Sequence, residues 1–154
     1  MKACIKLWSA MAIGLTLLAG PLRGEFVYVA NENGNGSLLG SVSAYRIGPH
    51  GALTPVAGSP FPAGDLSLSV AVDPRGRFAY VANNGSNDVS AYRIGPHGAL
   101  TPVAGSPFPA GASPFSVAVD SWGRFAYVAN SISNNVSAYS IGENGALTPV
   151  AVGV

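Results

Sequence analysis

A 47-residue repeat, short runs of β-branched and aromatic residues and frequent turns containing Gly or Pro predict an all-β fold. The repeat is clearest at Tyr45, Tyr92 and Tyr139, which lie 47 residues apart within the phrases VSAYRIG, VSAYRIG and VSAYSIG. A period of about 40 to 50 residues is typical of one four-stranded propeller blade. The predicted fold is therefore a partial β-propeller of about three four-stranded blades, which follows an N-terminal signal segment.

Residues 1–24 are interpreted as a signal peptide. Lys2 and Lys6 supply a positive start, and the apolar run Leu7–Gly20 has the length of a signal core but is shorter than the roughly 20 residues that span a bilayer. We expect export to the periplasm or the extracellular space, with an uncleaved N-terminal anchor and a buried helix as alternatives. Because no second apolar segment of spanning length follows, no membrane contact is expected beyond this segment.

Residues 25–154 are predicted to form the propeller repeats. The phrase FVYVAN or FAYVAN recurs at Phe26, Phe78 and Phe125. The repeats divide into three predicted blades, at about 25–64, 65–111 and 112–154. The first blade is expected to lack its inner strand, because the signal segment stands where the later repeats carry SVAV. The segment holds just under three repeats, so closure requires self-association or further blades, and the isolated chain is not expected to be a stable monomer.

Within the middle repeat, turn residues separate four short β-type runs. The predicted strands are Ser69–Val72, Phe78–Ala82, Val89–Ile94 and Ala99–Ala104. The first strand has small residues, which suit the crowded propeller axis. The fourth contains Pro102, which cannot donate to a ladder, and is therefore placed at the outer edge. A β-sandwich is the alternative fold, and the regular 47-residue self-similarity argues against it.

Composition excludes several classes of function. The single Cys rules out a disulfide framework and a cysteine-based zinc site, and no cofactor or metal is expected. From Glu25 onward the chain has five Arg, no Lys and seven acidic residues, whereas nucleic-acid binding needs a clustered positive surface. Nucleic acid is therefore excluded as a partner.

The phrase PFSVAVD-xxGRFAYVAN-xxxNxVSAYxIGxxGALTPV, at Pro114–Val150 and nearly so at Ser67–Val103, resembles the blades of the seven-bladed β-propeller lactonase family. That family includes 6-phosphogluconolactonase-like proteins and is similar to YVTN-type repeats, with YVAN standing here in the YVTN place. The resemblance implies the propeller fold and hydrolysis of a sugar lactone. Just under three repeats, instead of seven, favour a partial propeller or a protomer that closes by association, and a gene fragment is a further alternative.

Candidate catalytic groups are few. Asp73 and Asp120 open turns and are each followed four residues later by Arg, which favours turn capping, and His50 and His97 occupy equivalent exposed turns. Asn31, Asn83 and Asn130 end the second strands and are expected to bind backbone at the following loop. No base and oxyanion site can be assembled from these groups, so the catalytic residues stay unknown.

Two functions remain open on these grounds. The chain is predicted to be an exported binding or structural module, or an incomplete propeller. The alternative is a hydrolase of a sugar lactone that is active only in a longer or assembled form. Variation among the repeats is greatest in the loops between the second and third strands and in the connections between blades, which are expected on the same face, and binding residues concentrate on such loops of a rigid scaffold. We therefore predict contact with a sugar-like ligand there. The candidate ligand-binding residues are Asn33, Asn35, Asn84, Asn87 and Asn134.

Overall fold

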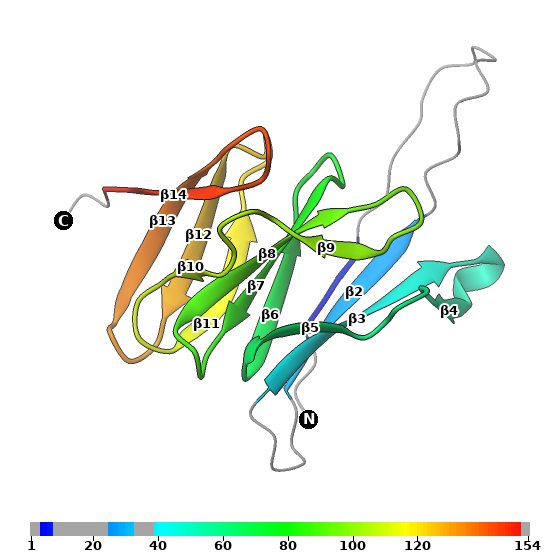
Figure 1. The fold of residues 1–154 in the computed structure, drawn as a ribbon, viewed down its shortest axis with the longest axis horizontal. Coiled ribbons are helices and arrows are strands. Elements are labelled where there is room, and N and C mark those ends of the chain that lie inside the picture. Colours follow the sequence, from blue (N-terminus) through cyan, green and yellow to red (C-terminus); the bar gives the residue numbers. More distant parts are fainter. Residues whose placement is uncertain (1–3, 8–24, 33–38, 152–154) are drawn as a thin grey trace.

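Three antiparallel sheets stand side by side in the computed structural model, which describes residues 4–7, 25–32 and 39–151 (Figure 1). Each sheet is one repeat, so the predicted all-β fold of partial propeller blades is confirmed. The sheets form an open row and do not close into a ring.

The strand bounds follow the repeats closely. The first sheet contains β1 (Cys4–Leu7), β2 (Phe26–Asn31), β3 (Leu39–Ile47), β4 (Leu53–Pro55) and β5 (Phe61–Asp65), with a short 3-10 turn η1 (Pro49–Gly51) before β4. The second contains β6 (Ser67–Val72), β7 (Phe78–Asn83), β8 (Asp88–Ile94), β9 (Leu100–Pro102) and β10 (Phe108–Pro109). The third contains β11 (Pro114–Val119), β12 (Phe125–Asn130), β13 (Asn135–Ile141) and β14 (Leu147–Val150).

The strand order within a blade agrees with the expected one. In the second sheet β6 is innermost and is followed by β7 and β8, and the proline-containing strand lies at the outer edge. That outer position is shared by two short strands, since β9 and β10 both pair with β8. The interruption follows from composition, because Pro102, Pro107 and Pro109 have no N–H to donate to a continuous ladder.

The inner position of the first sheet is occupied, in contrast to the expectation from sequence. β1 pairs antiparallel with β2, with Cys4 opposite Ala30 and Leu7 opposite Val27. It therefore takes the place that β6 and β11 take in the later blades. A strand needs only an extended backbone with a free partner edge, which β2 offers, and the absent SVAV motif is not required for that. The predicted signal core falls mostly on residues 8–20, outside the described residues.

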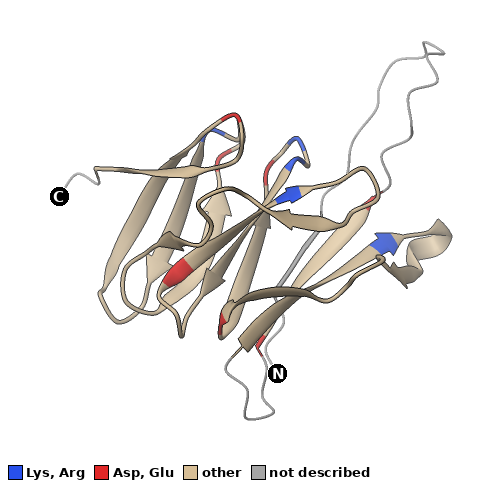
Figure 2. Ribbon diagram, viewed as in Figure 1, with Lys and Arg blue, Asp and Glu red and all other residues tan. Residues whose placement is uncertain are grey.

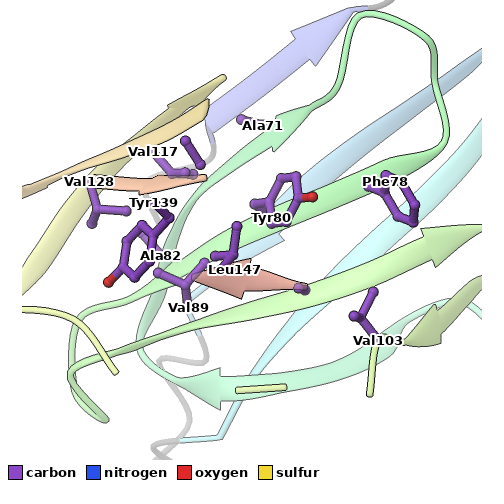
Figure 3. Packing of buried hydrophobic residues seen from close by; sticks show 12 residues of the cluster. Ala71, Phe78, Tyr80, Ala82, Val89, Val103, Val117, Val128, Tyr139 and Leu147 are labelled. Atoms are coloured by element: carbon purple, nitrogen blue, oxygen red, sulfur yellow. The ribbon is translucent and has the colours of Figure 1, made fainter. Parts of the chain in front are cut away.

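Two apolar layers lie between the three sheets, and each one joins consecutive blades. The layer between the first and second sheets includes Tyr28, Val42 and Val81. The layer between the second and third sheets includes Tyr80, Val117 and Val128, all of which are buried (Figure 3). Strands of the middle blade are thus apolar on both faces because each face is covered by a neighbour.

A repeated hydrogen bond joins each blade to the next one. The Tyr28 hydroxyl donates to the Gly98 carbonyl oxygen at 2.9 Å, and the Tyr80 hydroxyl donates to the Gly145 carbonyl oxygen at 3.1 Å. Burial raises the pKa of both phenols far above the ordinary value, so these hydroxyls stay protonated as donors. Tyr28 and Tyr80 hold equivalent positions in the first and second repeats, and Gly98 and Gly145 do so in the second and third, so the same contact recurs at both blade junctions.

Candidate functional site

The loops that carry the candidate asparagines gather at one end of the blades. Each loop between a second and a third strand packs on the connection that enters the same blade. The Asn84 amide donates to the Leu66 carbonyl at 2.9 Å, and the Ser131 amide donates to the Ser113 carbonyl at 2.9 Å. The same end therefore carries both of the segments in which the repeats differ most. We call it the asparagine end.

The asparagines singled out from sequence have different surroundings. Asn33 and Asn35 lie outside the described residues. The Asn84 side chain donates from Nδ2 to the Pro114 carbonyl at 3.3 Å, and Asn87 Oδ1 accepts from the Ser113 amide at 2.7 Å. Both bonds cross from the second blade to the third, so these two side chains join blades.

Asn134 occupies the position in the third blade that Asn87 occupies in the second. Both have a left-handed backbone, with φ of 50° at Asn134 and 59° at Asn87, a conformation that Asn tolerates better than most residues. Asn134 is exposed at the end of the row. Asn87 is exposed as well, but its Oδ1 is engaged by the Ser113 amide, so Asn134 is the more accessible hydrogen-bonding group of the two.

A second set of asparagines has a structural role that differs from the expected one. Asn83 Nδ2 donates to Asp88 Oδ1 at 2.6 Å and to the Ser90 hydroxyl at 2.8 Å, and Asn31 and Asn130 make the equivalent pairs of bonds. The sequence-based expectation that they bind backbone is therefore wrong for these amide groups. They bind side chains at the start of the third strand, because antiparallel pairing places that strand directly beside them.

One of these asparagines is not fully satisfied. Asn83 Oδ1 accepts from the Ser67 hydroxyl at 2.8 Å, whereas Asn130 Oδ1 is buried without a hydrogen-bond partner among the described residues. The difference has a simple cause, because Pro114 stands in the third blade where Ser67 stands in the second, and proline offers no hydroxyl.

The two ends of the blades differ in their cations: blue segments lie at one end, mixed with red ones, and the other end has red segments alone (Figure 2). The five arginines among the described residues lie in or beside the turns at the end opposite the asparagines. They are Arg46, Arg75, Arg77, Arg93 and Arg124. The asparagine end holds the carboxylates Glu32, Asp65 and Asp88 and, among the described residues, no Arg or Lys. This end can accept hydrogen bonds from hydroxyl groups, and the side chains described there include no cation that could hold a phosphate.

The repeated aspartates of the inner turns, Asp73 and Asp120, serve the fold, as the sequence analysis favoured. Asp73 is fully buried, and its Oδ1 accepts from the Arg77 and Phe78 amides at 2.5 and 2.8 Å. Its Oδ2 lies 3.3 Å from Arg77 Nε. Asp120 closes the equivalent turn of the third blade through Arg124 and Phe125. Neither carboxylate is placed to act as a free general base.

Asp120 is expected to make stability depend on pH. Burial alone raises the pKa of its carboxyl, but the Phe125 and Arg124 amides and the Arg124 guanidinium outweigh this and lower the pKa below its ordinary value. The unfolded chain then binds a proton more readily than the folded one, so stability rises with pH. In Asp120→Asn, we expect lower stability than wild type at neutral pH. The deficit should shrink as pH falls below about 4 through the lowered pKa.

Urea unfolding of both proteins between pH 2 and pH 7 measures this. If the stability difference between Asp120→Asn and wild type stays constant over that range, the charge of the Asp120 carboxylate does not contribute to stability.

The two histidines lie apart from any acid–base cluster. His50 and His97 are exposed in equivalent turns before β4 and β9, and His50 has a left-handed φ of 60°. No group of three or more His, Cys, Asp or Glu able to hold a metal ion occurs among the described residues. The described part of the chain also has no helix long and apolar enough to cross a membrane.

Two hollows, of about 220 and 300 Å³, recur at equivalent places along the outer edges of the blade junctions. The smaller one is lined by Pro62 and Tyr92 and the larger one by Pro109 and Tyr139, among others. In each, the tyrosine hydroxyl donates to the proline carbonyl at 2.5 Å. Because the lining repeats with the blades, these hollows are a property of the blade junction.

These features define a row of β-propeller blades whose polar groups serve mainly to join strands and blades. The chain belongs to the family described as "Lactonase, 7-bladed beta-propeller", whose model matches residues 16–105 and 70–153. The resemblance seen in the repeat phrases is thus confirmed. No curated protein matches the chain in sequence.

Solved structures support the same fold. A functionally unknown protein from Desulfotomaculum acetoxidans aligns over 84% of this chain and 38% of its own, with 21% identity and a TM-score of 0.70. The periplasmic gluconolactonase of Pseudomonas aeruginosa aligns over 82% and 38%, with 22% identity and a TM-score of 0.66. A Bacteroides fragilis protein described provisionally as a 6-phosphogluconolactonase aligns over 81% and 34%, with 23% identity and a TM-score of 0.70. The chain therefore spans little more than a third of each of these structures.

Proposed function

We propose that this chain is an exported propeller-repeat protein of the YVTN type that binds a neutral, sugar-like ligand at the asparagine end. The observation that carries the proposal is that the described arginines all lie at the other end of the blades. Asn134 and the carboxylates Glu32, Asp65 and Asp88 present hydrogen-bonding groups there without a cation among the described residues. Sugar hydroxyls both donate to such groups and accept from the amide, whereas a phosphate would be repelled.

Export is part of this proposal. It is supported by the positive start and the apolar run Leu7–Gly20 of the amino-terminal segment, and by the fold shared with a periplasmic gluconolactonase. An uncleaved N-terminal anchor is the competing arrangement, and it keeps β1 in the first sheet, whereas cleavage after residue 24 would remove that strand. Fractionation of the producing cells, with mass spectrometry of the amino terminus, distinguishes a cleaved exported chain from an anchored one.

Lactone hydrolysis is the second candidate, and family membership favours it. It requires a base that activates water and donors that stabilise the developing oxyanion. In the described part of the chain, Asp73 and Asp120 are occupied in turns and the histidines stand in separate exposed turns. Hydrolysis is therefore proposed only for a longer or assembled form.

Titration calorimetry and a hydrolysis assay with gluconolactone and 6-phosphogluconolactone test both candidates. We expect binding of gluconolactone, weaker binding of the phosphorylated compound, and no turnover above the spontaneous rate by the chain alone. Asn134→Ala should weaken binding several-fold, and the matched control Asn144→Ala, at the opposite end of the same blade, should not. If binding is lost instead on replacing Arg75 or Trp122, the site lies at the opposite end of the blades, where the described arginines are. Robust turnover that requires Asp73, Asp120 or His97 would establish the second candidate.

A further inference from the structure

The two ends of the row of blades are complementary halves of the same junction. At each internal junction, a Phe and a Tyr of one blade cover a Gly of the next, and a Leu of that next blade is buried beside them. Among the described residues, no blade covers this Gly and Leu of the first blade or this Phe and Tyr of the third. We define the front face as Val29, Tyr45, Gly51 and Leu53, and the tail face as Phe125, Tyr127, Val136 and Val150.

The tail face is apolar and uncovered. Tyr127 is 43%, Val136 44% and Val150 37% exposed. Their equivalents in the middle blade, one repeat earlier, are almost fully buried by the third blade. These are Tyr80, Val89 and Val103. The exposed side chains are thus the ones that bury most when a blade follows, and burial of such apolar area is the main driving force for association.

The front face lacks the matching partner. A Cβ at Gly98 would lie 2.4 Å from the Phe26 ring, and one at Gly145 would lie 2.4 Å from the Phe78 ring, whereas Gly51 has no atom within 4 Å of that position. Gly51 keeps the left-handed conformation of the other two, with φ of 79° against 84° and 88°. Its backbone is therefore already shaped to receive an aromatic ring.

The neighbouring leucine gives independent support. Leu53 is 54% exposed, while its equivalents Leu100 and Leu147 are 6% and 5% exposed because a preceding blade covers them. The residues from Val42 to Gly64 that carry Tyr45, Gly51 and Leu53 are identical to Val89–Gly111 of the middle blade. Tyr45, Gly51 and Leu53 of the front face are therefore the same residue types that the middle blade packs against the first blade.

We propose that a second copy of this chain covers the tail face with its front face, so that two copies associate head to tail. The Phe125 ring then packs on Gly51 of the other copy, and the Tyr127 hydroxyl donates to that glycine's carbonyl, as Tyr28 and Tyr80 do at the internal junctions. Head-to-tail contacts form a ring when the rotation closes. Closed propellers typically have about four to eight blades, so two copies with six blades fit that range and three copies do not.

Light scattering on the full chain gives the first test, and the expected mass is that of two copies. Leu53→Glu on the front face and Val136→Glu on the tail face should each yield monomers, because a carboxylate would be buried against an apolar surface. Thr101→Glu, at the exposed outer edge of the middle blade, is the matched control and should keep the mass of two copies. Tyr127→Phe should weaken association by roughly tenfold per contact, the order expected for one hydrogen bond.

Mixing the two charged variants gives the decisive result. Each retains the face that the other has lost, so an equimolar mixture should recover a two-copy species through one intact contact. This recovery also shows that both variants are folded. A monomeric wild type, an assembly of three or more copies, or a mixture that stays monomeric while wild type is dimeric would each overturn the proposal. These results are independent of ligand binding or lactone hydrolysis, so the proposed function can fail while this inference stands.

Discussion

Replacing Phe78 with alanine is expected to lower the free energy of unfolding by about 3–5 kcal/mol. The side chain is fully buried, and its ring covers Gly145 of the third blade. Figure 3 shows it with the other residues of the same apolar cluster. The guanidinium groups of Arg77 and Arg93 lie 5.1 and 5.2 Å from the ring centroid, so truncation removes these cation–π contacts as well as the apolar packing.

Urea unfolding followed by tryptophan fluorescence measures this decrease in the free energy of unfolding. Phe108→Ala is a suitable control, because this ring is only partly buried at the outer edge of the same sheet, and we expect a loss of about 1 kcal/mol. Equal losses in the two variants would contradict the central place of Phe78 in the blade junction.

Gly145→Ala is the second substitution with a large expected effect, about 3 kcal/mol of destabilisation. The new Cβ would lie 2.4 Å from the Phe78 ring, which overpacks the junction, and the residue has a φ of +88°, which L side chains rarely adopt. Both costs arise in the folded state, so unfolding should become easier in urea.

Gly105→Ala separates the two causes. Gly105 has nearly the same φ, +86°, but a Cβ there would meet its nearest atom, on Phe108, at an ordinary 3.5 Å. This control should therefore show only the backbone cost, about 1–2 kcal/mol. The double variant Phe78→Ala/Gly145→Ala should be less destabilised than the sum of the two single changes, because removing the ring removes the clash. Additive losses would mean that the ring and the glycine are not in contact.

Much of the fold was predictable because its signals are local and repeated. Tyr45, Tyr92 and Tyr139 mark the period, and the turn residues bound the strands within it. Pro102 identified the outer strand through its missing N–H, in agreement with the observed order from β6 outward. The inner strand β1 was not predictable, because Cys4–Leu7 shares no motif with the inner strands of the later blades.

For the candidate site, the sequence indicated the loops but not the contacts of their side chains. The sequence indicated the loops that vary, and the structure places Asn84, Asn87 and Asn134 at one end of the blades. The sequence did not indicate that Asn84 and Asn87 form hydrogen bonds with Pro114 and Ser113 of the next blade. One signal was available, because Asn87 and Asn134 lie one repeat apart, as expected of a residue that serves each blade junction.

The sequence by itself determined the fold class, the order of strands within a blade and the family, because these depend on period, side-chain size and missing backbone donors. Only the tertiary structure decided the partner of each polar side chain and which apolar faces stay uncovered. Tyr80 and Tyr127 occupy the same place in identical YVAN phrases, yet one is buried against Gly145 and the other is 43% exposed. The physical reason is that burial depends on whether another blade stands beside the residue, which no local pattern records.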